Sequence, residues 1–470
     1  MANKLNRRER FALCLYCAVV WLIQPLVRRK LLRRAKQEPE YGLRIQERFG
    51  RYSDAPSAGW LWVHAVSLGE TRAASLLIAQ LRSQQPDMKL LLTHGTASGW
   101  DAGRAILAPG DRQIWFPWDT PGAAGRFLAH FKPRVGLMLE TEVWPNMVQA
   151  CARHRVPLFL VNARLNRDSC AAANRLRWLS APAYRSMAGA FAQSSADANN
   201  LATLGARVHG VLGNIKFDAQ PVPEQLLAGR AWRRQIGRPV VMLVSSRDGE
   251  EAALIAALSA RRSAPGHRPG LEPQYQIMVV PRHPQRVPEV ARLFGAAGFS
   301  VSRRSEWLDK PHPADVWLGD TMGELTFYYA ISDVALLGGS FERFGGQNLI
   351  ESAACGCPLV MGPHTFNFTE AAKWAQDAGA ARRAPDMRLG LALALGWIDQ
   401  KDGLEIARAR CLEYAFAHQG ASRKTAAAVL ALLATPIQRV PGAINHASVG
   451  KQLEPMAKIS TPTAHQPGAT

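Results

Sequence analysis

The stretch "WLWVHAVSLGETRAASLLIAQL", residues 60–81, contains a short apolar strand, a tight loop and an amphipathic helix. Residues 60–66 are a mostly apolar run, whereas the apolar residues after Gly69 recur at helical spacing. A buried strand followed directly by a helix is the unit from which parallel sheets are built. Such sheets bind ligands at the carboxyl ends of their strands. The loop, with its one carboxylate, Glu70, is therefore predicted to belong to a ligand site.

The same alternation of apolar strands and amphipathic helices continues along the chain in two series. The predicted strands lie at 60–66, 89–93, 135–139, 157–161 and 188–193 in the first series, and at 239–246, 275–283, 315–320, 334–340 and 358–362 in the second. Alternating strands and helices predict the α/β class with parallel sheets. We therefore expect two facing Rossmann-like domains with a ligand cleft between the carboxyl ends of their strands.

Composition shifts divide the chain into six expected segments. The segments are an N-terminal anchor (1–38), a first Rossmann-like domain (39–218), a linker (219–224), a second Rossmann-like domain (225–410), C-terminal helices (411–434) and a disordered tail (435–470). The linker and the tail are suggested by proline and polar residues without periodicity. Residues 261–273 have the composition of a loop insertion.

The chain is strongly basic, because 57 Lys and Arg against 37 Asp and Glu give a net charge of +20. This charge predicts an anionic partner, which is a nucleic acid, a membrane surface or an anionic substrate. The seven cysteines match no complete zinc-binding spacing and are expected to be small buried residues in a reducing compartment. The sequence also contains neither a D-x-D triplet nor a P-loop motif.

An apolar run at residues 11–27 is flanked on both sides by Lys and Arg. As a helix this run reaches about 25 Å, which is short for a comfortable membrane span. Cations on both flanks instead favour a helix anchored at an anionic membrane leaflet, either inserted shallowly or barely spanning. The alternative is a buried helix of the first domain.

The loop around Glu70 has two possible roles. Ser67 and Glu70 have the S-x-x-E spacing of a helix capping box, which is a purely structural role. Gly69, however, would let a substrate approach the backbone closely. The helix dipole is expected to keep the Glu70 carboxylate ionised, as a general base requires.

Two loops of the second domain carry polar groups at strand ends. Arg282 and His283 follow a predicted strand and could hold a phosphate, although an exposed loop pair would look the same. Met322, Gly323 and Glu324 stand at a predicted helix start, where backbone groups could read a base edge. The alternative is an ordinary strand-to-helix turn.

The stretch "LLGGSFERFGGQNLIESAACGCPLVMGPHTFNF", beginning at Leu336, is the most specific. Gly345 and Gly346 are expected to open a helix, so that their amides approach an anionic group. Asn348 and Glu351 lie about one turn further on, where Glu351 could accept hydrogen bonds from ribose hydroxyls. This order of features is typical of nucleotide-sugar transferases with two facing domains.

Seven motifs, "HAVSLGE", "LETEVWPN", "GNIKFD", "PRHPQR", "GDTMGEL", "GGQNLIE" and "GPHTFNF", occur in this order between His64 and Phe368. Together they resemble the 3-deoxy-D-manno-octulosonic acid (Kdo) transferases of Gram-negative bacteria. The resemblance covers roughly residues 10–430. The chain differs from the family pattern at Arg247 and Gln347, where His is usual, and at Ser352, where Pro is usual.

The resemblance implies a GT-B glycosyltransferase that moves Kdo from CMP-Kdo to a lipid A precursor, lipid IVA, in lipopolysaccharide biosynthesis. The first domain would bind the acceptor and the second the donor. The implied reaction is inverting, needs no metal or other cofactor, and uses Glu70 as the general base. The implied location is the cytoplasmic face of the inner membrane, with anionic lipids and no nucleic acid as partners.

The resemblance also implies a set of binding residues. The donor-binding residues would be Lys216, Ser246, Arg247, Arg282, His283, Met322, Gly323, Glu324, Gly345, Gly346, Asn348 and Glu351. Ser67, Gly69, Glu140 and Glu142 would form the acceptor side or a structural loop. Arg247 and Lys216 are candidates to pair with the Kdo carboxylate.

Two other functions remain open at this point. One is a different GT-B nucleotide-sugar transferase that acts on a lipid-linked acceptor, for example a UDP-sugar enzyme. The other is a non-enzymatic basic protein that binds membranes or nucleic acid. No helix-turn-helix or aromatic RNA-binding motif supports the latter.

Overall fold

The computed structural model describes residues 5–263, 274–308 and 310–434. The contacts divide the chain into residues 1–428, which contain both sheets, and residues from 429 onward. Of the latter the structure describes 429–434, the end of the last helix. The predicted tail at 435–470 and most of the predicted loop insertion at 261–273 lie outside the described residues.

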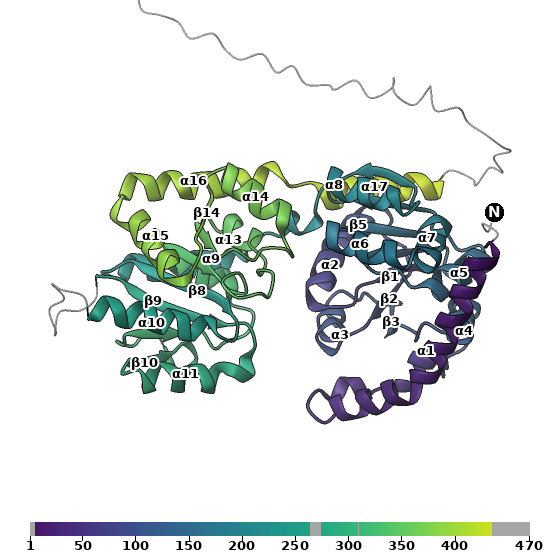
Figure 1. The fold of residues 1–470 in the computed structure, drawn as a ribbon, viewed down its shortest axis with the longest axis horizontal. Coiled ribbons are helices and arrows are strands. Elements are labelled where there is room, and N and C mark those ends of the chain that lie inside the picture. Colours follow the sequence, from purple (N-terminus) through teal and green to yellow (C-terminus); the bar gives the residue numbers. More distant parts are fainter. Residues whose placement is uncertain (1–4, 264–273, 309, 435–470) are drawn as a thin grey trace, which may run out of the picture. The chain divides into compact units, whose positions relative to one another are not determined.

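The first half of the chain forms a parallel sheet of seven strands in the order β3-β2-β1-β4-β5-β6-β7. The strands are β1 (Leu61–His64), β2 (Leu90–His94), β3 (Arg112–Trp115), β4 (Val135–Leu139), β5 (Leu158–Ala163), β6 (Gly189–Ala192) and β7 (Val208–Val211). The helices between them are α2 (Leu68–Gln84), α3 (Ala97–Arg104), α4 (Pro121–Phe131), α5 (Pro145–His154), α6 (Arg167–Arg175), α7 (Arg177–Ser186) and α8 (Ser195–Thr203). Figure 1 shows this domain in purple to blue.

The second half forms another parallel sheet of seven strands, in the order β10-β11-β9-β8-β12-β13-β14. The strands are β8 (Val240–Ser246), β9 (Gln276–Pro281), β10 (Val301–Arg303), β11 (Val316–Leu318), β12 (Val334–Leu337), β13 (Leu359–Met361) and β14 (Ala381–Arg383). Its helices are α9 (Pro223–Gln235), α10 (Glu250–Arg262), α11 (Val287–Ala296), α12 (Leu325–Ile331), α13 (Ile350–Ala354), α14 (Thr369–Asp377), α15 (Met387–Asp399) and α16 (Lys401–Ala417). The last helix, α17, is Ala421–Ala434.

Two parallel α/β domains were predicted, and both are present. All ten predicted strands occur, but β3, β7, β10 and β14 were not predicted. These four are the edge strands of the two sheets. An edge strand is paired on one side only, so its sequence need not be a continuous apolar run. β7, for example, has no fully buried residue, whereas β1, β4 and β12 are buried throughout.

The strand order reverses between β1 and β4 in the first sheet and between β8 and β12 in the second. Loops that follow such neighbouring strands diverge and leave a crevice at the carboxyl edge. Glu70 follows β1, and Glu140 and Glu142 follow β4. The chain passes from the first sheet to the second through a short 3-10 helix, η3 (Ile215–Asp218), and α9, which begins within the predicted linker.

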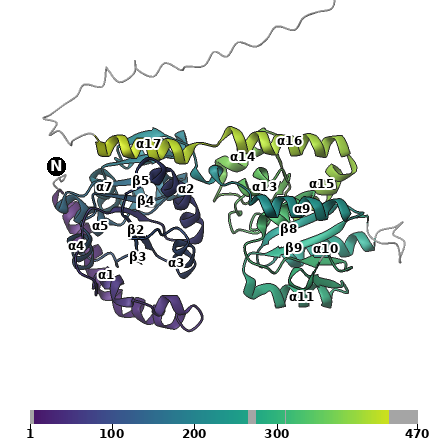
Figure 2. The ribbon, with the colours of Figure 1, turned by 180° about the vertical axis from the view of Figure 1, so that it is seen from behind.

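The N-terminal helix α1 (Arg7–Arg34) extends the predicted apolar helix through both basic flanks to 28 residues. It lies along the outside of the first domain in both views (Figures 1 and 2), against α5 and α7. Tyr16 donates a hydrogen bond to Asp119 (2.9 Å), and Glu9 pairs with Arg185 (2.6 Å). These contacts hold one face of the helix against the protein.

The opposite face of α1 is exposed. Phe11, Leu15, Leu22 and Leu26 are each more than half exposed, and they fall on one stripe at about 100° per residue. By length and composition alone α1 could cross a membrane, and only 6% of its apolar window is buried. The alternative prediction of a buried helix of the first domain is therefore wrong. The cysteines are buried as expected except Cys14, which is exposed on this helix, and Cys17, which is partly so.

Candidate functional site

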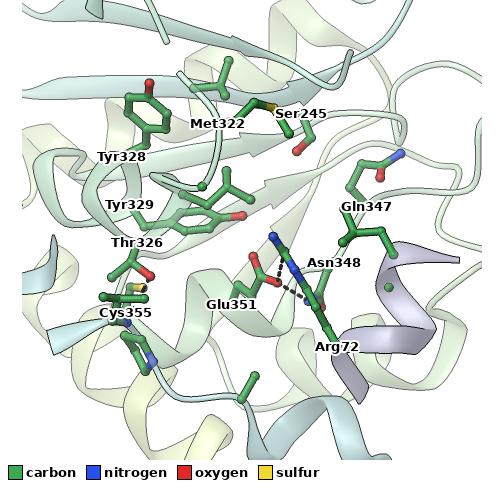
Figure 3. Close-up of a pocket in the computed structure, with 18 of the residues that line it drawn as sticks. Arg72, Ser245, Met322, Thr326, Tyr328, Tyr329, Gln347, Asn348, Glu351 and Cys355 are labelled. Carbon is green, nitrogen blue, oxygen red and sulfur yellow. Dashed lines mark hydrogen bonds and ion pairs between the residues drawn. The ribbon is translucent and has the colours of Figure 1, made fainter. Parts of the chain in front are cut away.

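A cavity of about 530 Å³ is lined by residues of both domains. Gly69 and Arg72 of α2 and Lys216 of η3 line it from the first half of the chain. The second half contributes Ser245 near the end of β8 and the loops after β9, β11 and β12, together with α12 and α13. Figure 3 shows Tyr329 and Thr326 of the second domain on one side and Gln347 and Asn348 of the same domain on the other, with Arg72 of the first domain reaching Glu351.

The Glu70 carboxylate is held by the backbone that precedes its own helix. Oε2 accepts a hydrogen bond from the Val66 amide (2.7 Å), and the Ser67 hydroxyl accepts one from the Glu70 amide (3.4 Å). In a standard capping box the Glu70 carboxylate would accept a hydrogen bond from the Ser67 amide rather than from the Val66 amide. The predicted cap is therefore present in a modified form. It fixes the carboxylate beside the cavity, although Glu70 is not itself among the lining residues.

Two further carboxylates and one ammonium group surround Glu70. The Glu140 carboxylate is buried and lies 2.7 Å from Nζ of Lys216. Burial, together with the charges of Glu140 and Glu142, raises the pKa of Glu70 to about 7. We expected the helix dipole to keep Glu70 fully ionised, and this expectation is wrong in direction. Desolvation and like charges outweigh the dipole because the carboxylate is removed from water.

Glu140 has a left-handed backbone conformation, with φ of 57°. This conformation is uncommon for residues other than glycine, and it re-aims the side chain at the end of β4. Glu142 accepts a hydrogen bond from Nε1 of Trp144 (2.8 Å), and its Oε2 lies 4.0 Å from Nε2 of His64. Burial lowers the pKa of His64 to about 3, so this ring is neutral. Glu70 therefore lies in a group of three carboxylates, with Lys216 as a nearby cation.

The second domain places Arg282 in the lining of the cavity, with Arg247 and His283 nearby. Nε of Arg282 donates to Oε1 of Gln347 (3.2 Å), and Nη1 of Arg247 lies 2.9 Å from Nε2 of His283. Burial and the neighbouring arginines lower the pKa of His283, so the neutral ring can accept this bond. Burial and the charges of Arg247 and Arg72 also lower the pKa of Arg282. Guanidinium groups that face one another form a ready site for an anion.

One buried carboxylate, Glu250, holds the loops that carry these groups. Its oxygens accept hydrogen bonds from the amides of Arg247 (2.9 Å), Gly339 (2.7 Å) and Phe341 (3.0 Å), with a longer bond from Glu342. The side chain is fully buried. Glu250 therefore joins the loop after β8 to the loop after β12. Sequence analysis missed it, although its position at the start of a helix after β8 is a signal that could have found it.

Comparison with known proteins identifies the family of this chain. A family model described as "3-Deoxy-D-manno-octulosonic-acid transferase (kdotransferase)" matches residues 43–219. The 3-deoxy-D-manno-octulosonic acid transferase of Bordetella pertussis is 43% identical over 86% of this chain and 95% of its own. The enzyme of the same name from Haemophilus influenzae is 31% identical over 76% and 83%. The chain belongs to the Kdo transferase family.

Solved structures agree on the fold. The UDP-GlcNAc 2-epimerase of Neisseria meningitidis is 15% identical over 80% of this chain and all of its own, with a TM-score of 0.51. A glycosyltransferase of Rickettsia africae is 11% identical over 81% and 99%, with a TM-score of 0.52. These likenesses support the GT-B arrangement of two facing domains. As a Kdo transferase, the protein is a glycosyltransferase.

Within this Kdo transferase, several predicted donor residues line the cavity or its rim. Lys216, Arg282, Met322, Gly323, Asn348 and Glu351 line it. Arg247 and His283 contact each other beside it. Asn348 donates to Oε1 of Glu351 (3.0 Å), as the two residues stand one turn apart. Of the acceptor-side set, Gly69 lines the cavity and Ser67, Glu140 and Glu142 surround Glu70.

The prediction that Gly345 and Gly346 open a helix is wrong. Gly345 and Gly346 do not open a helix, because α13 begins only at Ile350. Both have positive φ, and a Cβ at Gly345 would come within 2.5 Å of Asn367. The Gly346 amide donates to the carbonyl of Gly339 (2.7 Å). The pair therefore permits close packing within the loops, and the Gly346 amide is already bonded within the protein.

Two other predicted donor residues are engaged elsewhere. Ser246 is fully buried and donates to Glu251 (2.7 Å), while the preceding residue, Ser245, lines the cavity instead. Ser245 has a left-handed backbone, with φ of 54°, at an irregularity of β8. The regular alternation that a sequence pattern assumes therefore does not tell which of the two side chains faces the cavity. The Glu324 carboxylate pairs with Arg304 (3.0 Å) and does not line the cavity.

No group of three or more His, Cys, Asp or Glu side chains that could hold a metal ion occurs in the described part of the chain. That the reaction needs no metal stays a prediction.

We predict that Glu250→Gln loosens the two loops. The variant places an NH₂ group against backbone donors, and each buried amide left without a partner costs about 1–3 kcal/mol. Thermal unfolding should therefore occur at a clearly lower temperature. Glu405→Gln, at an exposed site on α16, is the matched control and should melt like the wild type. Equal melting temperatures for both variants would contradict the role of Glu250.

Proposed function

We propose that this Kdo transferase moves Kdo from CMP-Kdo to a lipid A precursor, lipid IVA, with inversion and without a metal ion. Glu70 is the general base. The observation that carries the proposal is the Glu70 carboxylate itself, with a pKa of about 7, held beside the cavity by the Val66 amide. A base with a pKa near neutrality combines a useful ionised fraction with a real affinity for the proton.

The donor fits the second domain's wall of the cavity. Arg282 and Arg247 offer positive charge to the phosphate of a nucleotide sugar. Asn348 and Glu351 offer an amide and a carboxylate to ribose hydroxyls. The nucleobase of the donor would lie near Met322 and Gly323, whose backbone follows β11. Because Glu324 is paired with Arg304, we assign it to the support of this loop.

The chemical step is a displacement at the anomeric carbon of Kdo. A hydroxyl of the acceptor attacks this carbon as the bond to the CMP phosphate oxygen breaks, and Glu70 takes the hydroxyl proton. The new bond forms on the face opposite the leaving CMP, which inverts the configuration. Negative charge grows on the departing phosphate, where Arg282 stabilises it. Lys216 stays paired with Glu140, so it acts on the charge of the base region and leaves the Kdo carboxylate to Arg247.

The acceptor and the membrane fit the first domain. A lipid A precursor carries phosphates and acyl chains, and a net charge of +20 suits an anionic partner. The exposed stripe of α1 that contains Phe11, Leu15, Leu22 and Leu26 would enter the headgroup region of an anionic leaflet. The docked face of the helix favours a helix that lies along the membrane over one that spans it. This arrangement, together with a nucleotide-sugar donor, supports the proposed location at the cytoplasmic face of the inner membrane.

The transfer itself is tested with purified protein, CMP-Kdo and tetra-acylated lipid A precursor, with a chelator present. Mass spectrometry should show that the lipid gains the mass of Kdo. CMP should raise the melting temperature of the protein, and UDP should not, because a ligand that binds the folded state stabilises it. Stabilisation by UDP alone, with no transfer, would favour a UDP-sugar transferase instead.

Glu70→Gln should lower the transfer rate by about 100-fold or more, since general bases contribute at least this much. CMP binding should be unchanged. Ionising Glu70 in the folded protein is unfavourable, because its folded pKa of about 7 lies above the ordinary 4.5. The penalty grows as pH rises between these values. The variant should therefore melt at a higher temperature than the wild type at pH 8, with a smaller difference at pH 5.

The pH profile of transfer reports the same group. Glu70 acts only when it is unprotonated, so the rate should rise with pH and level off above about 7. Glu140→Gln removes a like charge and leaves Lys216 beside Glu70, so the rise should move to lower pH. An unshifted rise in a folded, active Glu140→Gln protein would contradict the electrostatic account.

A further inference from the structure

Arg72 is a cavity residue that sequence analysis did not single out. It lies on α2 two residues after Glu70, and it extends to the facing domain (Figure 3). Its Nη1 lies 3.8 Å from Oε1 of Glu351 on α13. The same oxygen of Glu351 accepts a hydrogen bond from Asn348. Arg72 therefore contacts the carboxylate that is proposed to bind ribose.

The charges along the cavity leave Arg72 without a partner once Glu351 is taken. The charged side chains that line the cavity, among the described residues, are Arg72, Lys216, Arg282, Asp320 and Glu351. Lys216 is paired with Glu140, and both oxygens of Asp320 accept hydrogen bonds from Ser305. Arg72 and Arg282 thus share Glu351 as their nearby carboxylate, and the positive charges of the two arginines repel each other.

The ion pair between Arg72 and Glu351 is weak enough to be exchanged. The side chain of Arg72 is 55% exposed and that of Glu351 is 26% exposed. Pairs of this kind typically contribute about 0–1 kcal/mol, since water and salt screen them. A doubly anionic ligand between two guanidinium groups gives charge-assisted hydrogen bonds, which are about twice as strong as neutral ones. Exchange of Glu351 for such a ligand is therefore favourable for Arg72.

We propose that Arg72 is a donor-binding residue supplied by the acceptor-side domain. It pairs with Glu351 in this structure, and it turns to an anionic oxygen of the donor when the ribose takes Glu351. The oxygen belongs either to the phosphate or to the carboxylate of the sugar. This inference rests on the proposed nucleotide-sugar donor. Because Arg72 and Glu70 share one turn of α2, the contact would also fix the helix that carries the base relative to the donor.

The test compares three ligands that differ in their anions. Calorimetry measures the binding of cytidine, CMP and CMP-Kdo to the wild type and to Arg72→Leu. Cytidine has the ribose and no anion, so its affinity should be unchanged or slightly higher when Arg72 no longer competes for Glu351. CMP should bind about 10-fold more weakly if Arg72 contacts the phosphate. If CMP is unaffected and CMP-Kdo binds about 10-fold more weakly, Arg72 contacts the sugar carboxylate.

Two further variants complete the test. Arg72→Lys keeps the charge but loses the guanidinium fork, and its affinity for the anionic ligands should lie between those of the wild type and Arg72→Leu. Arg104→Leu is the matched control, because Arg104 makes an ion pair of the same length, 3.8 Å, at an equally exposed site on α3. It should bind all three ligands like the wild type.

The test distinguishes a failure of the proposed donor from a failure of the proposed role of Arg72. If the wild type binds neither CMP nor CMP-Kdo, the proposed donor is wrong and the inference falls with it. If the wild type binds both and Arg72→Leu binds them equally well, the donor stands and Arg72 has no role in binding it. An equal loss for cytidine, CMP and CMP-Kdo in Arg72→Leu would show a structural role and would also overturn the inference.

Discussion

The structure depends on the burial of parallel strands on both faces. Strands such as β1, β4, β8 and β12 are apolar and buried nearly throughout, so they have no room for reactive groups. Polar chemistry is therefore confined to the loops at the carboxyl edges of the two sheets. The strand order reverses between β1 and β4 and again between β8 and β12, so the loops that follow these strands diverge at the carboxyl edges. Most of the residues that surround Glu70 or face the proposed donor follow these strands or their neighbours, whereas Lys216 follows β7 and Met322 and Gly323 follow β11.

The two sides of the cavity differ in the sign of the charge that they carry. On the side of the first domain, Glu70, Glu140 and Glu142 stand close together, and the hydrogen bond from the Val66 amide and the charge of Lys216 only partly offset their effect on the pKa of Glu70. This arrangement raises the proton affinity of Glu70, which is the property that a base needs. On the other side, Arg282 and Arg247 are held near each other, which is unfavourable without an anion. The protein thus keeps excess negative charge where a proton would be accepted and excess positive charge where a phosphate would leave.

Groups that never touch a ligand maintain this separation. Glu250 is fully buried and ties the loops after β8 and β12 together through backbone amides. Gly345 and Gly346 allow the same loops to pack closely against residues 364–367. The modified cap at Ser67 and Val66 does the same for Glu70. Buried carboxylates and left-handed glycines are therefore used here as supports, and the exposed cations and amides are left for binding.

The sequence alone determined the α/β class, the two domains, the ten inner strands and the loops that carry Glu70, Arg282 and Glu351. These features follow from local apolar periodicity and from residue order, which need no knowledge of distant contacts. The edge strands, the exchange of Ser245 for Ser246, the pKa of Glu70 and the contact between Arg72 and Glu351 were decided by the tertiary structure. Each depends on groups far apart in the chain: a strand paired on one side, a face fixed by register, like charges brought together by two loops, and a helix that meets the opposite domain. Such contacts exist only after the chain has folded, because their energies come from burial and proximity rather than from neighbouring residues.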